Sequence, residues 1–306
     1  MLFAACLGLA LAWQAQTSAP SDTHPDVNLR AESTLVIIPV TVTDAANRYV
    51  LGLERGNFSI FEDGVKQRIS QFAAEDAPLS IGLLVDTSGS MGAKLGTSRN
   101  AAAEILKMMS AQDEAFLVEF SDTARLTVPF TGRKTENEDK LASAESEGLT
   151  ALLDAVDVAL EEMKHARNAR KALVLISDGG DNNSRYKAEE IQNLVREADV
   201  QVYCMGVFEP FTIFGLGTAE LSGPRLLTEL AEQTGGRAYP ARSFAALPAV
   251  ARKIAIELRN QYVIAYSPSR QGRDGKYHKV EVKLAAPPGL PALKAHWRLG
   301  YYAPAH

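Results

Sequence analysis

The chain has few of the residues on which disulfide-stabilised folds depend. Its 306 residues include only two cysteines. Cys6 lies in an apolar amino-terminal stretch, and Cys204 lies in the apolar run Val202–Val207, where a single thiol normally packs as a small hydrophobic side chain. We therefore expect no disulfide in the mature chain, which excludes the small disulfide-rich folds.

Histidine is also scarce, and this argues against acid–base catalysis. The five histidines are His24, His165, His278, His296 and His306. They fall in a tail, a helix end, the carboxyl-terminal strands and the last position, and none lies beside a serine that it could activate. Because a serine nucleophile needs an adjacent base, we expect a protein that is not an enzyme.

The chain also has no excess of positively charged residues. The net charge is −5 and the pI is near 5.7. Nucleic-acid binding requires a concentrated basic surface, so we expect no nucleic-acid partner. The local basic cluster Lys164–Lys171 is interpreted as a solvated helix end and loop.

No apolar run is long enough to cross a bilayer, so no transmembrane span is expected in the mature chain. Met1–Trp13 is almost wholly apolar and precedes the polar stretch Gln14–Pro25. This pattern is typical of a signal peptide cut near Ala12 or Ala15, although no Lys or Arg precedes it. We expect residues 1–25 to be a signal and tail, and the protein to be exported, either periplasmic or secreted. Lipidation at Cys6 is not expected, because apolar residues continue beyond it.

The chain does contain an apolar run that ends in a carboxylate followed by two hydroxyls. Asp86, Ser88 and Ser90 follow the run Ile81–Val85, which is typical of a strand buried on both faces. Oxygen ligands without His or Cys suit a hard cation: Mg²⁺ first, with Mn²⁺ or Ca²⁺ as alternatives. Because a helix is predicted from Lys94 onward, a helix N-cap is the competing interpretation.

Two later segments favour the metal. Lys171–Asp181 is again an apolar strand that ends in a carboxylate, Asp178, and a glycine turn. Gly148–Leu152 places the hydroxyl of Thr150 directly before a helical pattern. In an open α/β sheet such junctions meet at the carboxyl ends of the strands, where ligands bind.

The ordered set Asp-x-Ser-x-Ser, Gly-x-Thr and Ser-Asp-Gly resembles the metal-ion-dependent adhesion site (MIDAS) of von Willebrand factor type A domains. The resemblance implies that Ser88, Ser90 and Thr150 touch the cation directly, and that Asp86 and Asp178 do so directly or through water. It also implies that an Asp or Glu carboxylate of a partner protein completes the coordination. The implied activity is metal-bridged protein binding or cell adhesion.

The surrounding pattern predicts an α/β fold around this motif, because strands alternate with helices. The resemblance specifies a Rossmann-like, doubly wound, mostly parallel sheet of six strands over residues 77–261. Expected strands lie at 115–120, 124–128, 200–207 and after Gly236, and expected helices near 191–197, 226–234 and 244–259. The phosphate-binding nucleotide fold is excluded because Gly-x-x-x-x-Gly-Lys-Ser/Thr does not occur. An Mg²⁺-dependent aspartyl phosphatase would need a second Asp where Ser88 stands.

The two flanks, residues 26–76 and 262–306, have strand patterns instead. We expect strands at 34–44 and 57–62, an Asp63-Gly64 hairpin with a return strand Val65–Phe72, and strands at 261–266, 279–284 and 296–302. Neither flank alone should be stable, so we predict that they pair into one small β-sandwich. The layout resembles that of integrin β chains. Phrases such as Phe58–Gly64 also resemble a subfamily described mainly from Acidobacteria.

Three functions stay open at this point. The first is a metal-dependent protein-binding module of the bacterial envelope or exterior. The second is a structural or assembly protein of the envelope in which the metal only stabilises the fold, and the third is a metal-dependent hydrolase. The apolar loop Phe208–Gly217 follows a predicted strand on the metal side and is interpreted either as a binding surface or as a loop folded onto the domain.

Overall fold

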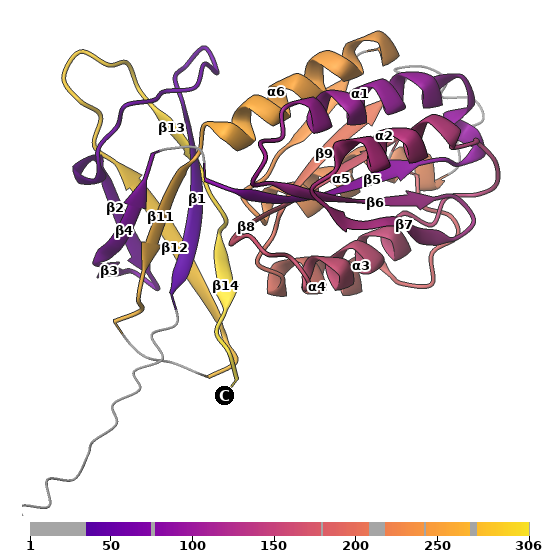
Figure 1. Cartoon of the computed structure of the whole chain (residues 1–306). Coiled ribbons are helices and arrows are strands. Elements are labelled where there is room, and N and C mark those ends of the chain that lie inside the picture. Colours follow the sequence, from indigo (N-terminus) through magenta and orange to yellow (C-terminus); the bar gives the residue numbers. More distant parts are fainter. Residues whose placement is uncertain are drawn as a thin grey trace, which may run out of the picture. The chain divides into compact units, whose positions relative to one another are not determined.

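The computed structural model describes residues 35–74, 77–178, 180–207, 218–241, 243–269 and 274–305. A six-stranded sheet runs through the middle of the chain in the order β10-β9-β8-β5-β6-β7 (Figure 1). Its strands are β5 (Leu79–Asp86), β6 (Glu114–Phe120), β7 (Ala124–Thr131), β8 (Arg170–Ser177), β9 (Gln201–Val207) and β10 (Ala238–Ala241). All neighbours pair in parallel except β6 and β7, which confirms the predicted mostly parallel sheet.

The sheet is covered on both faces, as continuous apolar strands require. Every residue of β5 is buried. At Gly82, an added Cβ would lie 2.3 Å from the Phe116 ring and 2.5 Å from Leu173. Only glycine therefore lets these two side chains close over the centre of β5.

The helices divide between the two faces and form two separate cores. One core contains α1 (Leu95–Lys107), α2 (Lys134–Ser143) and α6 (Leu247–Arg259). The other contains α3 (Leu152–Met163), α4 (Ala188–Glu197) and α5 (Thr218–Glu232). Figure 1 shows α1 and α6 over one face and α3 and α4 over the other. This is the doubly wound arrangement that the alternating pattern predicted.

Helix α2 was not predicted. It buries only Asn137 and Leu141, so no apolar stripe marks it in the sequence. Helix α5 begins at Thr218, earlier than the expected start near Leu226. The short 3-10 turns η2 (Gly89–Lys94) and η3 (Phe244–Ala246) lead into α1 and α6, respectively. The loop 208–217 lies outside the described residues.

The two flanks form a pair of four-stranded sheets, each built from both ends of the chain. One sheet has the order β13-β1-β11-β4 and the other β14-β12-β2-β3. The amino-terminal strands are β1 (Val36–Thr43), β2 (Phe58–Glu62), β3 (Val65–Gln67) and β4 (Ile69–Ala73), with the 3-10 turn η1 (Arg55–Asn57) before β2. The carboxyl-terminal strands are β11 (Tyr262–Tyr266), β12 (Tyr277–Leu284), β13 (Lys294–His296) and β14 (Gly300–Tyr302). The predicted β-sandwich of the two flanks is confirmed.

Two strand predictions were wrong: each of the two segments forms two short strands, one in each sheet. The return strand Val65–Phe72 breaks at Arg68: β3 pairs with β2, whereas β4 pairs with β11. The expected strand 296–302 likewise divides into β13, which pairs with β1, and β14, which pairs with β12. Each of these two segments therefore contributes one strand to each sheet.

An aromatic cluster joins the two sheets. Phe58 of β2 lies with its ring centroid 5.0 Å from that of Tyr262 and 5.5 Å from that of Phe72, which belong to the facing sheet. Buried Glu62 is not left unpaired, because the hydroxyls of Tyr266 and Tyr301 donate to its carboxylate at 2.7 and 3.0 Å. The sandwich thus has a core of its own.

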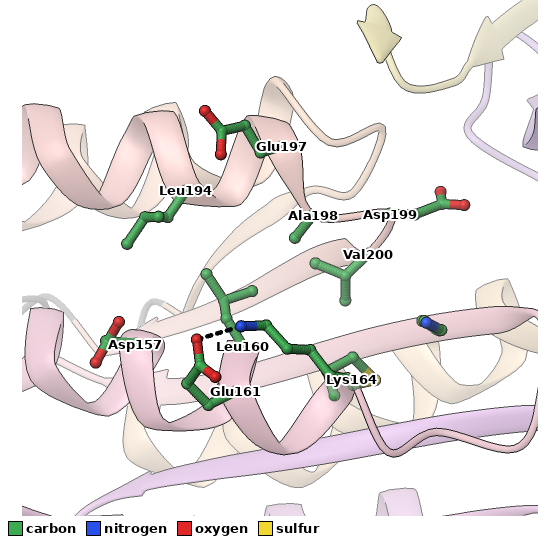
Figure 2. Close-up of a pocket in the computed structure, with 11 residues that line it drawn as sticks. Asp157, Leu160, Glu161, Lys164, Leu194, Glu197, Ala198, Asp199 and Val200 are labelled. Atoms are coloured by element: carbon green, nitrogen blue, oxygen red, sulfur yellow. Dashed lines mark hydrogen bonds and ion pairs between the residues drawn. The ribbon is translucent and has the colours of Figure 1, made fainter. Parts of the chain in front are cut away.

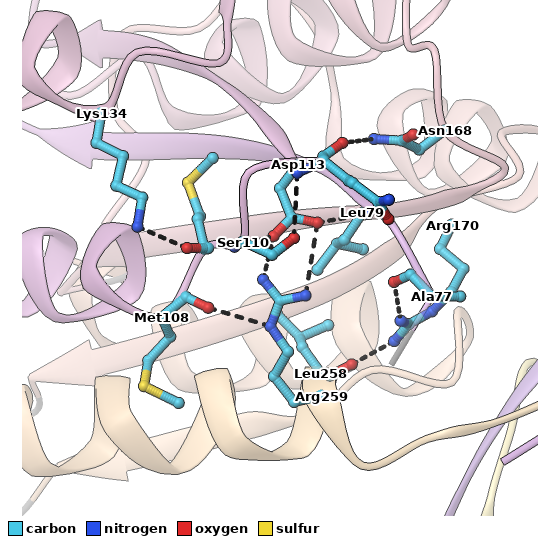
Figure 3. Close-up of polar contacts among 12 residues, drawn as sticks. Ala77, Leu79, Met108, Ser110, Asp113, Lys134, Asn168, Arg170, Leu258 and Arg259 are labelled. Atoms are coloured by element: carbon cyan, nitrogen blue, oxygen red, sulfur yellow. Dashed lines mark hydrogen bonds and ion pairs between the residues drawn. The ribbon is translucent and has the colours of Figure 1, made fainter. Parts of the chain in front are cut away.

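The chain enters and leaves the α/β domain at the amino edge of the central sheet, and polar contacts join the two segments (Figure 3). The Arg170 guanidinium donates to the Ala77 carbonyl at 2.7 Å and also to the Leu258 carbonyl. Asp113 accepts the Leu79 N–H at 2.8 Å and pairs with Arg259 at the end of α6. The entry segment before β5 and the end of α6 are therefore fixed to each other through two buried charged groups, Arg170 and Asp113.

Residues 1–34 lie outside the described part of the chain, so the predicted signal segment is not addressed by the structure. Among the described residues, no helix is both long and apolar enough to cross a membrane.

Candidate metal centre

Asp86 ends β5 and is fully buried at the carboxyl edge of the sheet. Its Oδ2 accepts the Ser177 hydroxyl at 2.6 Å, and its Oδ1 accepts the Ser88 N–H at 2.9 Å. Burial raises the pKa of Asp86, the hydrogen bonds from Ser177 and Ser88 lower it, and the nearby charge of Asp178 raises it; the resulting pKa is about 6. A bound cation would balance the negative charge of these two carboxylates.

The hydroxyls that follow Asp86 do not serve as a helix cap. Ser88 is the N-cap residue of η2, yet its side chain makes no capping hydrogen bond. Its Oγ instead lies 3.0 Å from the Oγ of Ser90. The two hydroxyls are thus adjacent and aimed at the same region, which argues against the cap interpretation and for a shared ligand.

Backbone hydrogen bonds hold the Thr150 loop against the Ser88 loop. The Gly89 N–H donates to the Gly148 carbonyl at 2.9 Å, and the Glu147 N–H donates to the Thr87 carbonyl at 2.9 Å. Gly148 has a φ of +79°, and an added Cβ there would lie 2.5 Å from the Asp122 carboxylate. A glycine before Leu149 and Thr150 is therefore required by the tight turn.

The loop after β8 fixes Thr150 from the other side. The Thr150 carbonyl accepts the N–H groups of Asn182 and Asn183 at 3.0 and 3.1 Å, and its own N–H donates to the Asn182 side chain at 2.8 Å. Thr150 is 4% exposed. Its position is set through its backbone, so its hydroxyl is not required for the local structure.

Asp178 directly follows Ser177, whose hydroxyl bonds Asp86, so the two predicted carboxylates lie at the ends of neighbouring strands β5 and β8. The structure thus connects all five predicted residues through three hydrogen-bonded loops. Asp178 also has a partner that sequence reasoning missed: the Lys94 ammonium lies 3.4 Å from its Oδ2. In the sequence, Lys94 is marked only as the start of a helix.

Further polar residues that support the site were not predicted. Asp122 accepts the Leu149 N–H at 2.7 Å. Asp181 accepts the Leu152 N–H at 3.0 Å and the Ser184 hydroxyl at 2.6 Å, so it caps α3. Asp122 could have been noticed in the sequence, because it comes shortly after a predicted strand. Its hydrogen bond to Leu149 could not be inferred, because the two residues are far apart along the chain.

The chemistry of the donors fits a hard divalent cation. The candidates are two carboxylates and three hydroxyls, with no nitrogen or sulfur ligand, as Mg²⁺ prefers. Within the described residues, no three His, Cys, Asp or Glu side chains are arranged to hold a metal. A set with only two carboxylates depends on its hydroxyls, so Ser88, Ser90 and Thr150 would supply the remaining protein ligands.

A hollow in the α/β domain lies away from these residues. This groove of 310 Å³ separates α3 from α4 and is lined by Leu160, Leu194 and Val200, with Glu161 and Lys164 paired at its rim (Figure 2). Lys171 and Val200 mark the amino ends of β8 and β9. The groove is therefore at the opposite edge of the sheet from Asp86 and Asp178.

The structure is an α/β domain whose candidate site lies at the carboxyl ends of its parallel strands. A family model for the von Willebrand factor type A domain matches residues 81–180. The chain therefore contains a von Willebrand factor type A domain, as the motif predicted. The resemblance to the Acidobacterial subfamily stays a prediction.

Sequence relatives cover only part of the chain. An uncharacterized protein of Borreliella burgdorferi is 27% identical over 183 residues, which are 53% of this chain and 54% of that protein. Inter alpha-trypsin inhibitor heavy chain 4 of Mus musculus is 31% identical over 157 residues, which are 45% of this chain and 17% of that protein. The chain thus spans about half of the first relative and less than a fifth of the second.

A solved structure supports the fold over most of the chain. A von Willebrand factor type A protein from Catenulispora acidiphila has a TM-score of 0.52 and 12% identity, and covers 89% of this chain and 75% of that one. Proximal thread matrix protein 1 from the mussel byssus has a TM-score of 0.52 and 18% identity, and covers 65% and 51%. At such identities the likeness concerns the fold alone.

Proposed function

We propose that this protein is a metal-dependent protein-binding module, and that its partner offers an Asp or Glu carboxylate to a divalent cation at the carboxyl edge of the sheet. The supporting observation is the pair of adjacent hydroxyls, Ser88 and Ser90, which follow a buried carboxylate without capping a helix. Asp86, Ser88, Ser90, Thr150 and Asp178 would hold Mg²⁺, with Mn²⁺ or Ca²⁺ as alternatives. When bound, the cation supplies an open coordination position for the partner's carboxylate.

The residues themselves have separate tasks in this proposal. Ser177 orients the Asp86 carboxylate through a 2.6 Å hydrogen bond. The backbone bonds between residues 87–89 and 147–148 fix the distance between the Ser88 and Thr150 loops. Ser90 is exposed, so a partner side chain can approach the site from solvent. Binding without catalysis is proposed because none of the described histidines is on these loops.

A purely structural role for the metal is the alternative. Backbone hydrogen bonds argue against this alternative. The bonds from Gly89 to Gly148 and from Asn182 to Thr150 already join the three loops, so a metal is not needed to hold them together. We also propose that the protein acts in the bacterial envelope or outside the cell, because the pattern of residues 1–25 is typical of a signal peptide.

Titration with Mn²⁺ tests the site first. The wild-type protein should bind one Mn²⁺ by calorimetry, and Asp86→Asn should lose this binding. Glu161→Gln is the matched control, since it also removes one negative charge but lies on α3 in an exposed pair with Lys164. Equal Mn²⁺ binding by wild type and Asp86→Asn would refute the site.

A model peptide tests the role of the open position. A short peptide with a single aspartate should bind the Mn²⁺-loaded protein, and the same peptide with asparagine should not. If the metal is only structural, chelation should lower the Tm strongly while neither peptide binds. That outcome would contradict the binding function and support the alternative.

A further inference from the structure

Lys94 occupies an unusual position for a lysine, because its charged end lies in the candidate metal centre. It is the last residue of η2, the turn that begins directly after Ser88. Its Nζ lies 3.4 Å from Oδ2 of Asp178, and the side chains of both residues are 18% exposed. This is a largely desolvated ion pair, unlike the open ion pairs on the helix surfaces.

A second contact holds the ammonium in place. Lys94 Nζ lies 5.1 Å from the centroid of the Phe244 ring in η3. Phe244 packs against the core formed by α1 and α6, so the ring has a fixed position. Attraction between an ammonium and an aromatic face is strengthened when the cation is shielded from water. The Asp178 carboxylate and the Phe244 ring therefore both hold the Lys94 ammonium in this position.

The Lys94 ammonium changes the balance of charge at the site. Asp86 and Asp178 lie close enough to repel each other. The Lys94 ammonium supplies one positive charge at the same place where a divalent cation would supply two. Because like charges repel strongly in a partly desolvated site, the ammonium and the divalent cation compete for the Asp178 carboxylate.

We propose that Lys94 is an internal counter-ion of the metal centre, which pairs with Asp178 when the divalent cation is absent and must move away from it when the cation binds. This inference rests on the proposed function, since it concerns the same site. Its consequence is a regulated affinity: Lys94 stabilises the metal-free protein and weakens cation binding, so occupancy would follow changes in cation concentration.

Three variants separate charge from shape. Lys94→Met keeps an unbranched apolar stem beside Phe244 but removes the charge, whereas Lys94→Arg keeps the charge. Lys140→Met is the matched control, because Lys140 pairs with Glu119 at 3.8 Å on other elements. Calorimetric titration with Mn²⁺ should give a Kd about tenfold lower for Lys94→Met, a typical size for coupling between two bound groups. Lys94→Arg and Lys140→Met should bind as the wild type does.

A metal-free measurement tests the pairing by itself. In chelator, Lys94→Met should have a lower Tm than the wild type, and this loss should disappear in the Asp178→Asn background, where there is no carboxylate to pair. A Tm loss that persists in that background would overturn the pairing. An unchanged Mn²⁺ Kd in Lys94→Met would overturn the competition while leaving the metal centre intact. If neither wild type nor Lys94→Met binds Mn²⁺, both the competition and the proposed function fail.

Discussion

Replacing Asp113 by asparagine should destabilise the protein more than any surface charge change. The Asp113 side chain is fully buried, accepts the backbone N–H groups of Leu79 and Ser110, and pairs with Arg259, whose side chain is 12% exposed. The asparagine would keep the shape of the side chain but leave a nearly buried guanidinium without its counter-charge. Breaking a buried ion pair by removing one partner costs about 3–5 kcal/mol. We therefore expect a loss of that size in the free energy of unfolding.

Urea denaturation followed by circular dichroism at neutral pH measures this loss. Glu104→Gln is the control: Glu104 pairs with Lys107 and Arg252, but these partners are 62% and 52% exposed, so its loss should cost less than about 1 kcal/mol. If Asp113→Asn costs no more than Glu104→Gln, the buried pair does not hold the entry and exit segments together.

The pH dependence gives a second check on Asp113. Burial alone would raise its pKa, but the hydrogen bonds from Arg259 and from two backbone N–H groups outweigh burial and lower it. A group whose pKa is lowered on folding stabilises the protein above its unfolded pKa and loses this effect as the pH falls through its folded pKa. The stability difference between wild type and Asp113→Asn should therefore shrink in acid, below about pH 4. A difference that grows in acid would refute this account.

Three other changes have defined outcomes. Gly82→Ala should destabilise the fold by about 1–3 kcal/mol in urea, because the new Cβ would overlap the Phe116 ring; no loss would show that the core yields at this point. Gly148→Ala should weaken Mn²⁺ binding in calorimetry, because its Cβ would displace the Asp122 carboxylate and with it the Thr150 loop. An unchanged affinity would show that the Thr150 loop does not contribute to Mn²⁺ binding. For His278, burial opposes protonation, but hydrogen bonds to the carboxylates Asp63 and Asp274 outweigh it and raise the pKa, so the Tm deficit of His278→Gln should be full in acid and shrink as the pH rises past neutrality.

The central sheet could be predicted because its sequence signals are local. A strand buried on both faces has a continuous apolar sequence. β5 ends in Asp86, β8 is directly followed by Asp178, and glycines come soon after both in the sequence. The rule that ligands bind at the carboxyl ends of such strands then placed Asp86, Thr150 and Asp178 together without any coordinates. The motif supplied the positions, and the hydrogen-bonded loops show how the backbone brings them near one another.

The flanks were harder because pairing partners, not local pattern, decide where a strand ends. Residues 65–72 were predicted as one return strand after the Asp63-Gly64 turn, yet β3 pairs with β2 in one sheet and β4 pairs with β11 in the other. Whether a strand crosses at Arg68 depends on residues far away along the chain. Helix α2 was missed for another reason, since a helix that buries only Asn137 and Leu141 has no apolar period to detect.

Lys94 shows what pattern reasoning cannot supply at a functional site. In the sequence it is a polar residue near a helix start, and its contacts with Asp178 and Phe244 join three segments that are far apart along the chain. The buried pair at Asp113 lies at the amino edge of the sheet, whereas Lys94 and Asp178 lie at the carboxyl edge. Distant sites without shared partners contribute additively to stability. The proposed movement of Lys94 at the carboxyl edge would therefore leave the contacts between the entry segment and the end of α6 unchanged, as an adjustable metal centre on a rigid sheet would require.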